Sequence, residues 1–551
     1  MKKFCSLFTR TPRLEYVNIL AKEKFCVTNS GKEYKDARGG MINMAETVRL
    51  NKYNRSSSDF VTPGMQLHYV AQVKPDETAA IVVHKDWQEE RISWSELDKL
   101  SSRIAWMLMD KGVGQNSTVL VSYPNTIEHI AANFAIWKTG ACYMPISWRT
   151  PPEELLELQK LLCPSAALTD IDVTETMFKC GMSELAQACA GYPDEMPPDV
   201  ISNPNIINAS GGSTGKPKLI RQNIPCGHSD LSLSSWFEVS GMKMDQTQLL
   251  CGPLFHGAPH IAAMNGIFSG GTLVLPQSLC PEFLIDCIEK YDIKFLQTVP
   301  TLMHRMIKIP GLKKESFAGM EALCHTGGVC SEWLKRAWLQ LISPEKLYEM
   351  YSMTEVIGMC AIRGDEWLKH PGSVGQPKYG SKISIRDSEG NELAPFEIGN
   401  IFMSPPAGHF YTEYINEKPL DTKGDNFRSV GDMGYVDNEN YLYFSDRRCD
   451  MIVTGGENVF AAEVENALLR NLHVLDAVIV GIPDPEWGRR IHAVLETDGE
   501  LDVASIKEFL KNYLVPYKIP KTFEIVKRIP RLDNGKVARE AILKDCISRG
   551  V

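Results

Sequence analysis

A short glycine-rich stretch at residues 208–220 combines the residue types that hold phosphate groups. Its sequence is NASGGSTGKPKLI. Glycines let backbone N–H groups approach an anion closely, hydroxyl side chains add donors, and lysines add positive charge. The stretch therefore predicts a phosphate-binding loop, made of Ser210, Gly211, Gly212, Ser213, Thr214, Gly215, Lys216 and Lys218.

The spacing in this loop does not match the P-loop of nucleotide hydrolases. That motif places a glycine five residues before the Gly-Lys pair and a Ser or Thr directly after it, whose hydroxyl binds magnesium. Aligned on Gly215-Lys216, the first position is Ser210 and the magnesium position is Pro217, which has neither a hydroxyl nor a backbone N–H. The loop therefore indicates a different class of phosphate chemistry.

Further motifs follow the loop in a fixed order along the chain. They are HTGGV (325–329), YEMYSMTE (348–355), GSVGQP (372–377), SVGDMGYVD (429–437), YFSDRRCDMIVTGGENVFAAEVE (443–465) and PRLDNGKVARE (530–540). This ordered set resembles the adenylate-forming superfamily, which includes acyl-CoA synthetases, luciferases and the adenylation domains of peptide synthetases. The resemblance spans roughly residues 60–545.

The resemblance implies an ATP-dependent, AMP-forming acid–thiol ligase that uses Mg²⁺ and coenzyme A. A substrate carboxylate attacks the α-phosphorus of ATP, pyrophosphate leaves, and the acyl-adenylate passes its acyl group to coenzyme A. In this family the phosphate loop grips the departing phosphates. Lys536 is implied to offset the repulsion between the carboxylate and the α-phosphate, which is an electrostatic role.

The same resemblance assigns residues around the nucleotide. Thr354 would contact the α-phosphate, and Glu355 would hold Mg²⁺, a cation that prefers carboxylate and phosphate oxygens. Adenine would lie against Tyr351 and Ser352 on one side and against the glycines of HTGGV on the other. Asp432 and Arg447 would reach the ribose hydroxyls. The implied nucleotide-binding residues outside the phosphate loop are Gly327, Gly328, Tyr351, Ser352, Asp432 and Arg447.

The family also implies a hinge and a side that faces coenzyme A. Cys449 stands at the position where the family has a hinge, so that a smaller C-terminal domain can rotate between the two half-reactions. Gly455 and Gly456 match a backbone stretch that approaches the pantetheine arm. The short distance from Lys536 to the end of the sequence, with no carrier-protein segment, favours free coenzyme A as the acceptor.

The acid itself is expected to be apolar, with a pocket built from residues 228–330. Its expected lining includes Phe255, His256, Gly257, Ala258 and Met264. Several stretches, among them GPLFHGAPH and IRGDEWLKHPGS, resemble bacterial bile acid–coenzyme A ligases. That resemblance implies a cholate-type substrate and the first step of bile acid 7α-dehydroxylation. The alternative is a medium-chain or aromatic acyl-CoA synthetase of the same fold.

Two hypotheses from other classes of protein remain beside an acid–CoA ligase, and the motifs oppose both. A nucleotide hydrolase is opposed by the failed P-loop spacing. A nucleotide-binding protein without activity would lack one of Glu355, Asp432 and Lys536, and all three are present.

The elements that would position these motifs alternate between short apolar strands and amphipathic helices from about residue 60 to 445. Strands are expected at 117–125, 271–276, 293–300 and 321–328, and helices at 126–140 and 281–292. Such alternation predicts an α/β fold with doubly wound parallel sheets and ligands at the carboxyl ends of strands. Hairpin signals within 381–446 predict a small barrel-like antiparallel part.

The chain is expected to divide into three regions. Residues 1–45 form an N-terminal extension, expected to be poorly ordered, and residues 46–446 form the large adenylation domain. Residues 447–551 form a small, mobile α+β domain, with strands at 475–483 and 491–497 and a helix at 503–514. The hinge is expected near 447–449.

Composition limits the remaining possibilities. The 551 residues have a net charge of −9, with 44% hydrophobic and 23% charged residues, which is typical of a soluble globular protein and not of one that binds nucleic acid. The apolar runs are too short to span a membrane. The 15 scattered cysteines, without ligand or disulfide spacing, are expected to be free thiols in a cytoplasmic protein. The sequence leaves open whether the protein forms a homo-oligomer.

Overall fold

The fold is taken from a computed structural model, which describes most of the chain after residue 60. The described residues are 33–35, 41–43, 60–173, 178–210, 218–405, 412–416, 418–420, 422, 426–447, 450–499, 501–531 and 537–551. Of the predicted site residues, Gly211 to Lys216, Cys449 and Lys536 lie outside this set, as does most of the N-terminal extension. Within that extension, β1 (Glu33–Lys35) pairs antiparallel with β2 (Met41–Asn43).

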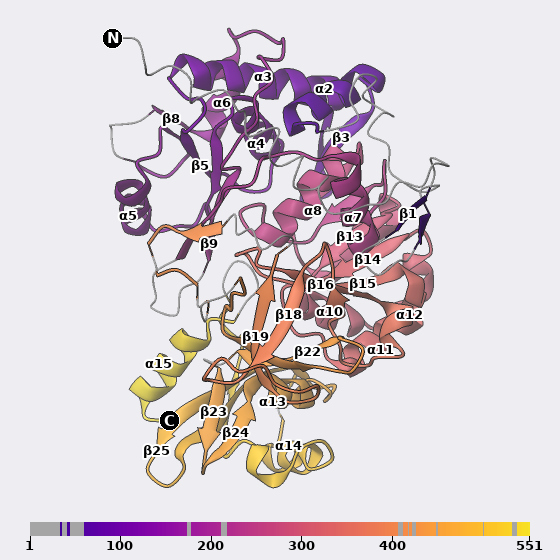
Figure 1. The fold of residues 1–551 in the computed structure, drawn as a ribbon, viewed down its shortest axis with the longest axis vertical. Helices are drawn as coiled ribbons and strands as arrows, with labels where there is room; N and C mark the ends of the chain where they lie inside the picture. Colours follow the sequence, from indigo (N-terminus) through magenta and orange to yellow (C-terminus); the bar gives the residue numbers. More distant parts are fainter. Residues whose placement is uncertain are drawn as a thin grey trace.

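A nine-stranded sheet forms one half of the N-terminal part, residues 60–447 (Figure 1). Its strand order is β17-β16-β15-β14-β13-β11-β12-β3-β4. The bounds are β3 Thr78–Val83, β4 Glu89–Ser93, β11 Gln248–Leu250, β12 Leu273–Pro276, β13 Phe295–Thr298, β14 Ala322–His325, β15 Leu347–Ser352, β16 Met359–Arg363 and β17 Gln376–Pro377. The inner strands from β3 to β15 are parallel, as the alternating sequence predicts, and both edges are antiparallel.

A seven-stranded sheet forms the other half and carries the two strands that flank the phosphate loop. Its order is β20-β10-β9-β6-β5-β7-β8. The bounds are β5 Thr118–Ser122, β6 Cys142–Pro145, β7 Ala166–Thr169, β8 Phe178–Cys180, β9 Ile206–Ser210, β10 Lys218–Gln222 and β20 Thr412–Tyr414. Strands β9 and β10 pair antiparallel, because the chain between Ser210 and Lys218 is too short for the crossover that parallel neighbours need. The expectation of parallel sheets is therefore right for the sheet interiors and for the β7–β8 edge, whereas the other three edges are antiparallel.

Helices cover both sheets and join them through a shared apolar core. The bounds are α2 Pro63–Val73, α3 Trp94–Asp110, α4 Ile127–Lys138, α5 Pro152–Leu162, α6 Met182–Cys189, α7 Asp230–Ser240, α8 Gly257–Phe268, α9 Pro281–Lys290, α10 Pro300–Ile307, α11 Glu332–Leu341 and α12 Gly364–Trp367. Helix α4 is apolar on nearly all sides and buried along its length, and its cluster includes strands of both sheets. Thr126 caps its first turn, accepting a hydrogen bond from the His129 backbone N–H at 3.3 Å.

A four-stranded antiparallel sheet closes the N-terminal part, as the hairpin signals predict. It consists of β18 (Lys382–Arg386), β19 (Gly399–Ser404), β21 (Asp432–Val436) and β22 (Leu442–Arg447). In Figure 1 this sheet lies next to the elements that follow residue 450.

Those later elements form what is called here the C-terminal unit, residues 450–551. It contains β23 (Met451–Thr454), β24 (Glu457–Phe460), α13 (Ala461–Leu468), β25 (Val474–Asp484), β26 (Gly488–Thr497), α14 (Val503–Leu510), β27 (Thr522–Val526) and α15 (Arg539–Arg549). Apolar clusters made from its own residues fill both faces of the β25-β26-β27 sheet. The predicted strands and helix of this region are confirmed, while its domain boundary at 447–449 stays a prediction.

Two properties of the described residues bear on the sequence-based expectations. Their helices are too short or too polar to cross a bilayer. The cysteines within 60–173, 178–405 and 450–551 are free thiols, as their scattered positions predict.

Buried histidines predict that the fold loses stability in mild acid. Burial lowers the pKa of His129 from 6.5 to about 4, and its ring bonds the Tyr123 carbonyl oxygen at 2.8 Å and the Tyr143 hydroxyl at 2.6 Å. Between these two pKa values the unfolded chain binds more protons than the folded one, so stability falls as the pH falls. One such group contributes a loss of about 2 kcal/mol at pH 5.

Thermal unfolding at pH 8, 6.5 and 5 tests this expectation. We expect the midpoint to fall steeply below pH 6.5, and the His129→Gln variant to have a lower midpoint at pH 8 but a shallower pH dependence. His473 is 67% exposed, so His473→Gln is the matched control and should keep the wild-type slope. An equal slope in the His129→Gln protein would contradict the role given to this buried ring.

Candidate active site

The predicted nucleotide-binding residues lie at the ends of strands from both sheets and from the four-stranded sheet. Gly327 and Gly328 follow β14 after one residue, Tyr351 and Ser352 end β15, and Asp432 begins β21. Since β14 and β15 are parallel neighbours, their carboxyl ends meet at one sheet edge. This is the location expected for ligands in an open α/β sheet.

The two glycines after β14 form a close turn against helix α10. Gly327 has a φ of +80°, a conformation that favours glycine. A Cβ atom at Gly327 would lie 3.7 Å from Val299 Cγ1, and one at Gly328 would lie 3.7 Å from Pro300 Cδ. The turn therefore packs against the residues at the start of α10. Because both residues are glycines, its other side presents backbone rather than side chains.

Tyr351 and Asp432 meet although 81 residues separate them in the sequence. The Tyr351 hydroxyl donates a hydrogen bond of 2.7 Å to Asp432 Oδ2, and the Asp432 side chain is buried. In the β21–β22 ladder, Asp432 is the register partner of Arg447. Ser352 Oγ donates to the Gly358 carbonyl oxygen at 3.1 Å. The aromatic ring and the acid that the motifs predict for adenine and ribose are thus joined in one place.

Thr354 and Glu355 lie in the turn after β15 and are held by two strands of the other sheet. Gln222 Nε2, at the end of β10, donates to the Thr354 carbonyl oxygen at 3.0 Å. The Tyr414 hydroxyl, on β20, donates to Glu355 Oε1 at 2.6 Å. Lys218 Nζ lies 5.5 Å from the centroid of the same tyrosine ring. The strand that leaves the phosphate loop therefore reaches the predicted magnesium carboxylate.

Two residues of this arrangement, Gln222 and Tyr414, are missing from the sequence-based set. Gln222 is 132 residues from Thr354, and Tyr414 is 59 residues from Glu355. No local spacing marks either residue, because their contacts depend on the pairing of β20 with β10 and on the approach of the two sheets.

The predicted acyl-pocket residues lie at the start of α8. Phe255 is buried, His256 is the residue before the helix, and Gly257 and Ala258 are its first two residues. The Phe255 ring packs against Trp148 with centroids 5.6 Å apart, and a Cβ atom at Gly257 would meet no atom within 4 Å. Met264, about two helical turns further along α8, is instead buried in the apolar core. An aromatic wall with open space beside it fits an apolar ligand.

The two glycines predicted to face coenzyme A form the turn of the β23–β24 hairpin. Gly455 and Gly456 have φ values of +58° and +87°, the combination that two-residue hairpin turns favour. The Gly455 N–H donates to the Trp487 carbonyl oxygen at 2.9 Å, and a Cβ atom at Gly456 would meet no atom within 4 Å. The turn therefore presents backbone at Gly456.

Apart from the Glu355 carboxylate, one group of described residues has its ligand atoms close enough to hold a metal ion, and it lies in the C-terminal unit. Ligand atoms of His492, Glu524 and Cys546 lie within 4.8 Å of one another. Both Glu524 oxygens accept hydrogen bonds from Arg549, at 2.8 and 2.9 Å, and Arg549 Nη2 is 3.8 Å from Cys546 Sγ. The guanidinium thus already supplies a cation to this group, whereas the partner of the Glu355 carboxylate within the described residues is the neutral Tyr414 hydroxyl.

The Tyr351 hydroxyl gives a test of this geometry. If Asp432 binds the ribose, Tyr351→Phe should raise the KM for ATP about three- to tenfold with little change in kcat, because Asp432 loses the donor that fixes its side chain. Initial rates at varied ATP concentration measure this. Tyr348→Phe, on the same strand, is the control. An unchanged KM, or a loss in kcat alone, would contradict the assignment.

Comparison with known proteins identifies the family. The family described as AMP-binding enzyme matches residues 67–409, and the family described as AMP-binding enzyme C-terminal domain matches residues 463–536. An uncharacterised acyl-CoA ligase of Bacillus subtilis is 28% identical over 474 residues, which cover 83% of this chain and 94% of that protein. A 2-succinylbenzoate–CoA ligase of Bacillus licheniformis is 27% identical over 490 residues, covering 86% and 98%.

A solved structure shares the fold. The o-succinylbenzoate CoA synthetase of Bacillus subtilis, in complex with its acyl-adenylate intermediate, superposes with a TM-score of 0.73 at 24% identity, covering 88% of this chain and 98% of that one. The comparisons support an ATP-dependent acid–CoA ligase that uses Mg²⁺ and coenzyme A, and they give no support to the bile acid expectation. The chain therefore belongs to the family of AMP-binding enzymes, within the adenylate-forming superfamily of acyl-CoA synthetases.

Proposed function

We propose that this protein joins an aromatic carboxylic acid to coenzyme A through an acyl-adenylate, releasing AMP and pyrophosphate. The observation that carries the proposal is the turn at Thr354 and Glu355. Tyr414 of β20 bonds the Glu355 carboxylate, and Lys218, at the end of β10 that adjoins the phosphate loop, has its Nζ 5.5 Å from the centroid of the same tyrosine ring, so this end of the loop lies near the predicted magnesium carboxylate. Such an arrangement suits displacement at the α-phosphorus, with the departing phosphates held by the loop.

Each described residue has a defined part in this reaction. Lys218 supplies positive charge beside the departing phosphates, and Glu355 offers one carboxylate to Mg²⁺, which neutralises phosphate charge when bound. Tyr351 packs against adenine opposite the Gly327-Gly328 turn. Asp432 accepts hydrogen bonds from the ribose hydroxyls, as a carboxylate with two oxygens can.

The remaining residues of the predicted site complete the proposal. Residues 211–216 would donate backbone and hydroxyl hydrogen bonds to the β- and γ-phosphates. Lys536 would neutralise the approach of the substrate carboxylate to the α-phosphate. Cys449 remains the proposed hinge, and Arg447 the second ribose contact. After rotation of the C-terminal unit, the Gly455-Gly456 turn would lie along the pantetheine arm of coenzyme A during transfer of the acyl group.

The aromatic acid is proposed over the bile acid because of the relatives and because of the aromatic side chains at the start of α8. The named relatives whose substrate is stated act on 2-succinylbenzoate, an aromatic acid. Phe255 and Trp148 offer ring edges and faces to such a group at the start of α8. A cholate-type acid is the second candidate, favoured by the stretches GPLFHGAPH and IRGDEWLKHPGS.

A product assay with a panel of acids tests the proposal. The protein is incubated with ATP, Mg²⁺ and coenzyme A, and with 2-succinylbenzoate, benzoate, ferulate, octanoate or cholate in turn, and the products are identified by mass. AMP, pyrophosphate and a thioester formed with the aromatic acids are the expected result. Thioester formed only with cholate would replace the proposed substrate and keep the reaction. Release of ADP without a thioester would overturn the reaction itself.

A further inference from the structure

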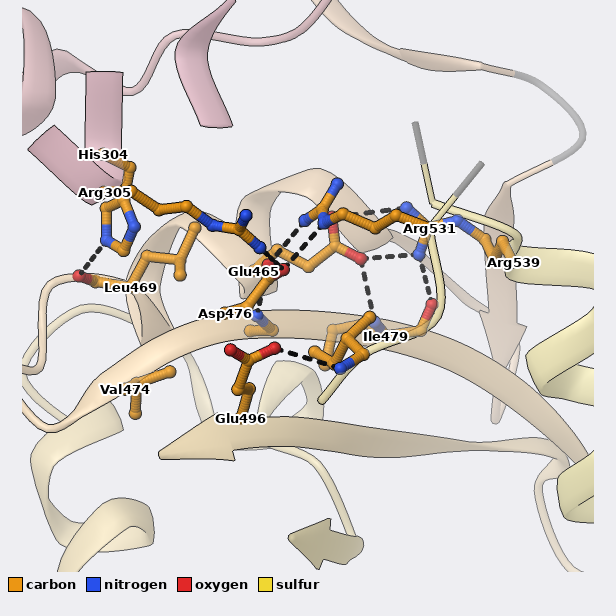
Figure 2. A network of polar contacts seen from close by, with 12 residues as sticks. His304, Arg305, Glu465, Leu469, Val474, Asp476, Ile479, Glu496, Arg531 and Arg539 are labelled. Carbon is orange, nitrogen blue, oxygen red and sulfur yellow. Dashed lines mark hydrogen bonds and ion pairs between the residues drawn. The ribbon is translucent and has the colours of Figure 1, made fainter. Parts of the chain in front are cut away.

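Three polar side chains at the end of helix α10 contact the C-terminal unit: His304 and Arg305 on its last turn (Figure 2), and Lys308, the residue after the helix. His304 Nε2 lies 3.4 Å from the Leu469 carbonyl oxygen, and Lys308 Nζ donates to the Val474 carbonyl oxygen. Burial lowers the pKa of His304 to about 4, so its neutral ring can donate this hydrogen bond. Arg305 Nη2 is 3.8 Å from Asp476 Oδ2, which makes an ion pair without a direct hydrogen bond.

Asp476 is also the anchor of Arg531 within the C-terminal unit. Arg531 donates from Nε to Asp476 Oδ2 at 2.7 Å and from Nη2 to Asp476 Oδ1 at 2.6 Å. Asp476 Oδ1 accepts a further hydrogen bond from the Ala477 backbone N–H at 2.9 Å, and its side chain is only 5% exposed. A buried, bidentate pair of this kind fixes both side chains. Asp476 therefore connects Arg531 with Arg305.

Arg531 begins the segment that carries Lys536. Arg531 and Val537 pair in an isolated antiparallel bridge, so the two ends of residues 532–536 are held together. Shortly after that segment, Arg539 Nη1 donates to Glu465 Oε1 at 2.6 Å. The residues on both sides of this segment are thus held in place. Asp476, which binds Arg531 on the N-terminal side of the segment, also faces the N-terminal part (Figure 2).

Helix α10 leads from this contact directly to the adenine side of the site. Its first residues, Val299 and Pro300, support the Gly327-Gly328 turn, and Arg305 follows within two helical turns. Six residues of helix span about 9 Å. A short, buried helix is stiff at this length, so the base of the Lys536 segment has a defined distance from the nucleotide site.

We propose that Asp476 is a positioning residue for adenylate formation: through Arg531 it fixes the base of the segment that carries Lys536, and through Arg305 it docks that base on helix α10. This inference rests on the proposed function, in which Lys536 acts in the first half-reaction. It assigns a positioning role to Asp476, Arg305 and Arg531, none of which belongs to the predicted set of substrate-contacting residues.

Separate measurement of the two half-reactions tests the role. Acid-dependent exchange of labelled pyrophosphate into ATP reports adenylate formation, and thioester formation from supplied acyl-adenylate and coenzyme A reports transfer. Asp476→Asn should lower exchange about ten- to hundredfold, the effect of a displacement near an ångström. Arg305→Ala should lower it about three- to tenfold, and Arg305→Lys should restore most of it. Transfer should change by less than about twofold in each variant.

Non-additivity and a matched control distinguish positioning from general destabilisation. Since Arg305 acts through Asp476, the double variant should be no slower in exchange than Asp476→Asn alone. Arg91→Ala removes an arginine whose partner, Glu89, is on the same edge strand, and it should leave both half-reactions unchanged. Equal losses in both half-reactions, or additive losses in the double variant, would overturn the proposal.

Hydrogen–deuterium exchange tests the docking contact between Arg305 and Asp476 independently of enzyme activity. Peptides covering 300–310 and 469–477 should exchange faster in Arg305→Ala than in wild type and Arg91→Ala. Unchanged exchange in these peptides would mean that Arg305 does not hold the two parts together, and the proposal would fail. A wild-type protein that exchanges no pyrophosphate with any acid would instead refute the proposed function, and the positioning role with it.

Discussion

Replacing Glu355 by glutamine should lower acid-dependent pyrophosphate exchange by about a hundredfold or more, the largest effect on activity expected here. The amide keeps the size of the side chain and can still accept the hydrogen bond from Tyr414, which is 2.6 Å from Glu355 Oε1. What it loses is the negative charge that would hold Mg²⁺ beside the phosphates. The loss should therefore fall on the chemical step and should become smaller as the Mg²⁺ concentration is raised.

Glu413→Gln is the matched control for this variant. Glu413 precedes Tyr414 on β20, is 51% exposed and pairs with Arg221 on β10 at 2.9 Å. An exposed pair contributes little, so its loss should change exchange by less than about twofold. If Glu355→Gln and Glu413→Gln behave alike, or if added Mg²⁺ has no effect on the Glu355 variant, the magnesium role would have to be abandoned.

The largest effect on stability is expected at Lys335, on helix α11. Its ammonium group donates a hydrogen bond to Glu349 Oε2, and both side chains are almost fully buried. Burial raises the pKa of the Glu349 carboxyl, and Lys335 opposes this shift. Lys335→Met would leave a buried carboxylate without its cation, which typically costs about 3–5 kcal/mol. We expect a marked fall in the midpoint of thermal unfolding.

Two further variants make this expectation specific. In Lys335→Met combined with Glu349→Leu, the uncompensated charge is gone, so a large part of the loss should be recovered. Arg336 is the next residue on α11, is 48% exposed and pairs with Glu332 on the same helix, so Arg336→Ala should shift the midpoint only slightly. A double variant less stable than Lys335→Met alone would contradict this account. Because Glu349 is on β15, two residues before Tyr351, the single variant should also weaken ATP binding.

The sheet interiors could be predicted from the sequence, and their edges could not. Runs such as those at 117–125 and 293–300 are apolar on both faces, which is the pattern of strands covered by helices on each side. The antiparallel edge strands β16, β17 and β20 carry no such pattern. Strand β20 has three residues, and only its pairing with β10 makes it part of the sheet.

The candidate site was predictable wherever its residues occur in local motifs. Gly327 and Gly328, Tyr351 and Glu355 lie in short stretches whose residue types are tied to one chemistry. Gln222 and Tyr414 were missed because each stands alone in its stretch. Their roles depend on hydrogen-bond partners that lie 132 residues away from Gln222 and 59 residues away from Tyr414 in the sequence.

The sequence alone predicted the type of chemistry, because a glycine-rich phosphate loop and the motifs expected to carry a magnesium carboxylate, a ribose-binding acid and a lysine occur in the order of adenylate-forming enzymes. These motifs can be recognised in short stretches of sequence, because the backbone freedom of glycine and the charge of a side chain depend on residue type and close neighbours. The tertiary structure alone decided that Tyr351 meets Asp432, that Tyr414 meets Glu355 and that Arg305 meets Asp476. Those contacts follow from strand order and from the packing of whole elements against one another, which no short stretch of sequence specifies.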